Sequence, residues 1–97
     1  MMFLIVLDPR SKDPVVHTKI DASVRTMGNW SNRLDNAWLL EADKLGARKI
    51  RDTLKDFLEE PDRLFVARIS RNWAGRGMGQ GFPEWMSRRD FGDFPNG

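Results

Sequence analysis

The chain has 97 residues and a mass of 11.2 kDa, which corresponds to one small domain with a single core. It contains no cysteine, which excludes disulfide bonds, thiolate metal sites and cysteine nucleophiles. The net charge is only +2, and the isoelectric point of about 9.4 is high because the chain lacks tyrosine and cysteine. The charge total therefore does not indicate a nucleic-acid-binding protein.

The chain begins with a continuous apolar run, residues 2–7, that Asp8 and Pro9 follow. Because proline cannot donate a ladder hydrogen bond, the run is predicted to be a buried central strand that ends there. The run is far shorter than the ~20 residues that cross a bilayer, and no basic residue precedes it as in a secretory signal. We therefore expect a soluble, cytoplasmic protein without membrane association.

The next segment has the signals of a helix. Asp13 and Pro14 are typical of an N-cap and a first helical position. Gly28 is expected to end the helix in a left-handed conformation. The apolar residues between them recur at helical spacing and are Val16, Ile20, Val24 and Met27.

Two strands, one helix and one further strand are predicted after that. Residues 30–34 and 37–42 flank Asp35-Asn36, a pair that is typical of a hairpin turn. A second helix is expected to begin at Asp43 as its N-cap, and residues 63–69 predict the fourth strand. The buried stripe of the second helix is Ala47, Ile50, Leu54, Phe57 and Leu58.

This order of elements over residues 1–70 predicts an α+β fold of the ferredoxin-like type. Such a βαββαβ sandwich has a four-stranded antiparallel sheet with two helices on one face. The other face of the sheet has no partner within residues 1–70. It is covered by the C-terminal segment or by a second subunit, or it is a binding surface.

Residues 71–97 form a C-terminal extension of different character. Its alternating glycines at positions 75, 77, 79 and 81 favour an irregular connection, and Pro83 is typical of the start of a short helix. A disordered tail usually contains few aromatic residues, so we expect this segment to dock on the sheet or on a partner subunit. Its large apolar residues are Trp73, Met78, Phe82, Trp85, Phe91 and Phe94.

Asp8 is the candidate catalytic and metal-binding residue. A carboxylate at the end of the central strand suits Mg²⁺ or Mn²⁺, and in a two-fold dimer two copies of Asp8 would hold one ion between them. The alternative is a turn aspartate that hydrogen-bonds to its own backbone before Pro9.

The C-terminal extension holds the candidate nucleic-acid-binding residues. From position 63 onward the chain has six arginines against three acidic residues, and arginine forks onto phosphate better than lysine does. The candidates are Arg71, Trp73, Arg76, Arg88 and Arg89, with arginine for the phosphodiester backbone and tryptophan for stacking on a base. The alternative is a flexible connection with Trp73 buried in the core.

These residues carry a resemblance to known families. The apolar first strand ending in Asp8, with the βαββαβ order, resembles the small CRISPR-associated protein two family and the related toxin family VapD. Residues 30–39, Ile50-Arg51-Asp52 and Trp73-Ala74-Gly75 are similar to those of small bacterial and phage proteins labelled SinR-family. The resemblance implies a homodimer with two packed sheets, often with a C-terminal strand that crosses to the partner.

The resemblance also implies two kinds of activity. Some relatives are metal-dependent nucleases in which the aspartate at the position of Asp8 binds metal between the subunits, whereas others are DNA-binding scaffolds or antitoxins without nuclease activity. We therefore predict a nucleic-acid-associated homodimer, either a metal-dependent nuclease or a non-catalytic relative. The alternative is a protein-interaction module, such as an antitoxin or a phage-encoded inhibitor, that binds its partner with the aromatic C-terminal segment.

Overall fold

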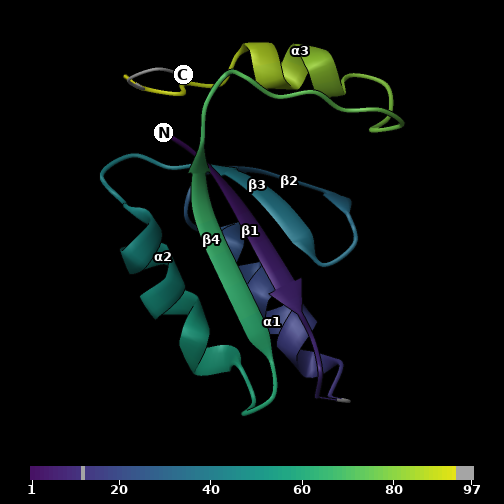
Figure 1. The fold of residues 1–97 in the computed structure, drawn as a ribbon, viewed down its shortest axis with the longest axis vertical. Helices are drawn as coiled ribbons and strands as arrows, with labels where there is room; N and C mark the ends of the chain where they lie inside the picture. Colours follow the sequence, from purple (N-terminus) through teal and green to yellow (C-terminus); the bar gives the residue numbers. More distant parts are fainter. Residues whose placement is uncertain (12, 94–97) are drawn as a thin grey trace.

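The computed structural model describes residues 1–11 and 13–93, so the last four residues of the predicted extension, including Phe94, lie outside the described residues. The described strands form one antiparallel sheet in the order β2-β3-β1-β4 (Figure 1). The predicted α+β class with a four-stranded antiparallel sheet is confirmed. The elements in chain order are β1 (Met2–Asp8), α1 (Val15–Val24), β2 (Asn29–Leu34), β3 (Ala37–Glu41), α2 (Ala47–Leu54), η1 (Lys55–Phe57), β4 (Arg63–Ile69) and α3 (Phe82–Ser87).

The main core lies between the sheet and the helices α1 and α2, which cover the same face (Figure 1). Because side chains alternate along a strand, every second residue of β1 enters this core. The indole N–H of Trp38 donates to the Asp21 carboxylate at 2.9 Å, so the largest core side chain keeps its hydrogen bond. Fully buried members of this core include Phe3, Ile5, Leu7, Val16, Ile20, Val24, Trp38, Leu40, Ile50 and Leu54.

The first helix is shorter than predicted at its C-terminal end. Its start is one residue later than predicted, because Pro14 is the N-cap and not the first helical residue, although the Asp13 carboxylate still accepts a hydrogen bond from the Val15 N–H at 2.9 Å. The predicted left-handed cap at Gly28 is wrong, because α1 ends at Val24 and Gly28 does not have a positive φ. A Cβ atom at Gly28 would lie 1.9 Å from the Glu41 carbonyl oxygen, so glycine is needed there for a close approach to β3.

The second helix begins later than predicted. Its N-cap is Gly46 rather than Asp43, since Lys44 between them has a left-handed backbone with φ 62° that cannot continue into a helix. The hairpin turn has Asn36 at φ 56°, and the Asn36 carbonyl accepts a hydrogen bond from the Leu7 N–H at 2.7 Å. The ends of β2, β3 and β4 lie within one residue of the predicted ones. Within residues 1–11 and 13–93, no helix is both long and apolar enough to cross a membrane.

Candidate functional site

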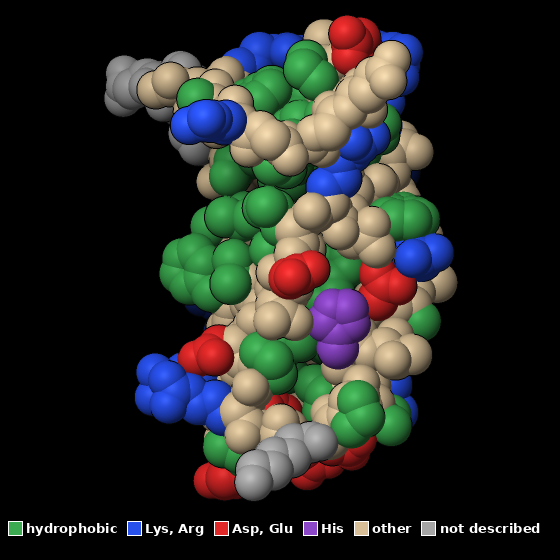
Figure 2. Space-filling view, turned by 90° about the vertical axis from the view of Figure 1, so that its right-hand side faces the viewer, with side chains coloured by type: hydrophobic (Ala, Val, Ile, Leu, Met, Phe, Trp, Pro, Cys, Tyr) green, Lys and Arg blue, Asp and Glu red, His purple; other side chains and the backbone are tan. Residues whose placement is uncertain are grey.

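The sheet face opposite α1 and α2, which we call the open face, is apolar and only partly covered. Phe65 of β4 projects from this face with 63% of its surface exposed. In profile at the left edge of Figure 2, hydrophobic side chains gather between the C-terminal segment above and charged side chains below. The apolar side chains that the strand register places on the open face are Leu4, Val6, Ala37, Leu39, Phe65 and Ala67.

The C-terminal segment, residues 71–93, packs on one end of the open face. Phe82 and Met86 of α3, together with Phe91, form a second buried cluster with Met2 at the start of β1. Figure 1 shows α3 above the end of the sheet at which β1 begins and β4 ends. The segment therefore covers this end of the face of its own chain and leaves the middle, including Phe65, uncovered.

Arginine side chains hold this segment through backbone carbonyl groups. Arg68 of β4 donates to the carbonyl oxygens of Phe91 at 2.9 Å and Asp93 at 2.6 Å. Arg71 donates to the Arg89 carbonyl at 3.1 Å, and its guanidinium lies 4.7 Å from the centre of the Phe91 ring. Hydrogen bonds from a charged donor are stronger than neutral ones, so these contacts fix the path of the segment.

Glu41 at the end of β3 completes the attachment. Its carboxylate accepts hydrogen bonds from Asn29 Nδ2 at 2.7 Å and from the Asp90 N–H, and it forms an ion pair with Arg89 at 3.4 Å. Burial by itself raises the pKa of Glu41, but these hydrogen bonds and the charge of Arg89 outweigh it and lower the pKa below its usual value. Glu41 is therefore ionised at neutral pH and ties the segment to the sheet.

A cavity of about 240 Å³ lies between the open face and the C-terminal segment. Leu34 of the hairpin and Trp73 of the C-terminal segment line this cavity, and 47% and 36% of their surfaces, respectively, are exposed to solvent. The Trp73 ring meets the Phe82 ring edge to face, with the ring centres 5.7 Å apart. The walls are almost entirely apolar and include Leu4, Leu34, Leu39, Trp73, Met78 and Phe82.

Asp8 lies at the opposite end of β1 from the C-terminal segment. Its carboxylate is half exposed and forms an ion pair with Arg10 Nε at 3.1 Å. No group of three or more His, Cys, Asp or Glu side chains that would hold a metal ion occurs within the described ranges. The seven residues of β1 span roughly 20 Å at 3.4 Å per residue, so one chain does not bring Asp8 together with the predicted nucleic-acid-binding residues.

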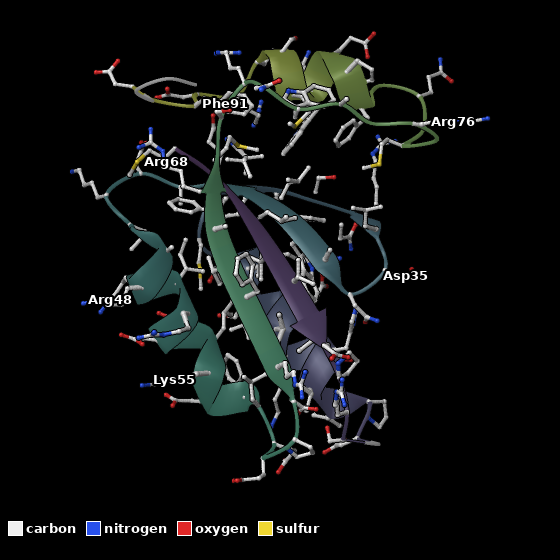
Figure 3. All side chains as sticks on the ribbon, viewed as in Figure 1. Asp35, Arg48, Lys55, Arg68, Arg76 and Phe91 are labelled. Carbon is white, nitrogen blue, oxygen red and sulfur yellow. The ribbon has the colours of Figure 1, made fainter. Side chains whose placement is uncertain are left out.

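The five predicted nucleic-acid-binding residues divide into two groups. Arg71 and Arg89 are used inside the fold, as described above, and Trp73 is a wall of the cavity. The side chains of Arg76 and Arg88 are exposed, and neither forms a hydrogen bond or ion pair with any described residue. Figure 3 shows Arg76 pointing away from the sheet at the far end of its loop.

Three surface residues of this site were not predicted from the sequence: Leu4, Leu34 and Phe65. The signal for Phe65 is present, because alternation along residues 63–69 places it with Arg63 on the face opposite Leu64 and Val66. The continuous apolar run of β1 hides the signal for Leu4, since both faces of that strand look buried.

Comparisons with known proteins found no match among family models, curated proteins or solved structures. The resemblance to the CRISPR-associated protein two and VapD families therefore stays a prediction. The function has to be inferred from the open face, the cavity and the exposed charges.

Proposed function

We propose that this protein is a protein-interaction module that binds a partner protein through the open face and its cavity. The observation that carries the proposal is the exposure of Phe65 on a face formed with Leu4 and Val6. Isolated exposed apolar residues are ordinary, but a contiguous apolar patch with polar residues around it indicates an interaction surface.

The shape of this surface favours a polypeptide over a small molecule. The cavity of about 240 Å³ is smaller than the roughly 300–1,000 Å³ of typical small-molecule sites, whereas about 150 Å³ is enough for a benzene-sized ring. Phe65 projects outward from the same sheet face and would need a pocket in the partner. A cavity and a projecting ring on one face suit the interlocking side chains of a protein interface, where Trp, Phe and Met are enriched.

Site-specific photocrosslinking tests the proposal in cells that express the full chain. A photoreactive phenylalanine analogue replaces Phe65, and the matched control carries the same analogue at Lys19, an exposed residue on α1. We expect a covalent protein adduct at position 65 that is at least tenfold more abundant than at position 19. Equal or absent adducts at both positions would contradict an interaction role for the open face.

A nucleic-acid-associated homodimer of ferredoxin-like fold is the second proposal. The specific observation in its favour is the exposure of Arg76 and Arg88 without partners among the described residues. In this proposal the helices on one sheet face and the order β2-β3-β1-β4 support the ferredoxin-like assignment. Two copies would pack through their open faces, as a non-catalytic protein or as a nuclease with Mg²⁺ or Mn²⁺ at Asp8.

Binding of labelled duplex DNA and single-stranded RNA at two salt concentrations, with Mg²⁺ present, tests this second proposal. Each phosphate contact that is lost reduces the slope of log affinity against log salt by about 1, so the Arg76→Gln/Arg88→Gln variant should lose about 2. Asp8→Asn should abolish any Mg²⁺-dependent cleavage. Absence of binding at low salt would overturn the proposal, and an unchanged slope would exclude these two arginines.

A further inference from the structure

One wall of the cavity is a loop that buries little of its own surface. We call residues 72–80, which lie between β4 and α3 and contain no helix or strand, the strap (Figure 1). Every residue of the strap except Met78 is exposed, whereas Phe82 and Met86 in the helix that follows are buried. A segment with few buried contacts opens at a lower cost in free energy than the core beside it.

The strap is anchored at its ends and weakly attached in its middle. Before the strap, Arg71 donates to the Arg89 carbonyl at 3.1 Å, and after it the buried cluster holds α3. Among the described residues, the hydrogen bonds of the strap run to its chain neighbours at positions 70, 71 and 82, with one exception. The exception is the Arg33 guanidinium of β2, which donates to the Met78 carbonyl at 2.9 Å. This single hydrogen bond joins the middle of the strap to the sheet.

The strap is shaped around the Arg33 guanidinium. Gly79 has a left-handed backbone with φ 96°, and a Cβ atom at this position would collide with Arg33 Nη1. The guanidinium carbon also lies 5.8 Å from the centre of the Phe82 ring. In the part of the chain that the structure describes, Arg33 forms no ion pair, so water can replace its carbonyl partner when the strap moves. An exposed hydrogen bond of this kind holds the strap without locking it.

We propose that the strap is a lid over the cavity, that Arg33 latches it, and that it opens while α3 stays docked. The inference rests on the proposed interaction function, because opening widens the cavity of about 240 Å³ for an apolar side chain of the partner. Trp73 and Met78 would move with the strap, whereas Leu4 and Leu39 of the sheet would stay in place as the floor. A partner that binds only the open state has its apparent affinity reduced to the open fraction. The latch therefore tunes binding.

Methyl groups of methionine report on the strap and on α3 separately. Met78 lies in the strap, and Met86 of α3 and Met2 of β1 lie in the buried cluster that holds the helix. The full chain is isotope-labelled at its methionine methyl groups, and relaxation dispersion measures exchange between closed and open states on the microsecond to millisecond timescale. We expect exchange at Met78 and none at Met86 or Met2.

Two variants release the latch from opposite sides, and each has a matched control. Arg33→Gln removes the guanidinium, and Arg76→Gln changes an exposed arginine of the strap without a partner among the described residues. Gly79→Ala places a Cβ against the guanidinium, whereas Gly77→Ala, also at a positive φ, has nothing within 4 Å of its Cβ. We expect the first variant of each pair to raise the open fraction roughly tenfold, the net worth of an ordinary hydrogen bond, and the controls to change it far less.

The same latch variant is then tested in cells. With the photoreactive analogue at Phe65, Arg33→Gln should form severalfold more adduct than the unlatched control Arg76→Gln, because more of the protein is open. Exchange shared by Met78 and Met86 would overturn the lid, since the whole segment would then move as one body, and so would an absence of exchange at Met78 in both wild type and Arg33→Gln. Less adduct in Arg33→Gln would overturn the role of the latch in binding. No adduct at Phe65 in any variant, with exchange at Met78 as expected, would overturn the proposed function and retain the lid.

Discussion

Replacing Met86 by alanine tests whether the C-terminal segment docks on the sheet of its own chain. Met86 is 1% exposed and packs with Met2, Phe82 and Phe91 in the second buried cluster. Truncation of a buried methionine to alanine costs about 2–5 kcal/mol of unfolding free energy. Because Met86 also lines the cavity, the space it vacates joins an existing groove, and we expect the lower part of that range, about 2–3 kcal/mol.

Urea and thermal unfolding followed by tryptophan fluorescence measure this loss. In a domain of this size, each kcal/mol lowers the Tm by roughly 4–8 °C. Val15→Ala, at an exposed position on α1, is the matched control and should change the free energy of unfolding by less than about 0.5 kcal/mol. A Met86→Ala loss equally small would refute docking of the segment, and a loss that varies with protein concentration would assign the contact to a second copy.

Three further predictions concern the residues that position the open face. Gly28→Ala should cost about 1–3 kcal/mol in urea unfolding, since its Cβ would lie 1.9 Å from a backbone oxygen, whereas Gly46→Ala, with nothing within 4 Å, should cost about 0.5 kcal/mol or less. Glu41→Gln should be less stable than wild type at pH 7, and the difference should shrink as the pH falls through the lowered pKa of Glu41; a difference independent of pH would contradict this. Backbone N–H groups, with that of Ser11 foremost, lower the pKa of Asp62 to about 2, so the stability lost in Asp62→Asn should be constant above about pH 5 and shrink to a small remainder by about pH 2.

The strands could be predicted closely because their ends carry strong local signals. Pro9 follows β1 directly, and the alternating residues of β4 stand between polar neighbours. The helix ends were predicted wrongly because the residues there do not carry an unambiguous local signal. Glycine at position 28 is typical of a left-handed cap, but the fold needs it for a close approach to β3. The left-handed backbone at Lys44 could not be predicted, because lysine has no preference for that conformation.

The candidate site was predictable only in part. The sequence indicates that the second face of the sheet requires a cover, and it indicates that the C-terminal segment is too aromatic to be disordered. Which residues of the open face stay exposed depends on contacts between positions far apart in the sequence. Phe82 packs with Met2, and the Arg33 guanidinium donates a hydrogen bond to the Met78 carbonyl at 2.9 Å. No local pattern encodes these distances.

The arginines of the C-terminal half show why charge counts alone mislead about function. Arg68 and Arg71 donate to backbone carbonyl groups, and Arg89 pairs with Glu41, so much of the positive excess after residue 62 holds the segment in place. Removing these side chains would release the segment and weaken any binding indirectly. Among the five predicted nucleic-acid-binding residues, substitution of Arg76 and Arg88 alone distinguishes a contact with nucleic acid from a contact within the fold, because it leaves the attachment of the segment intact.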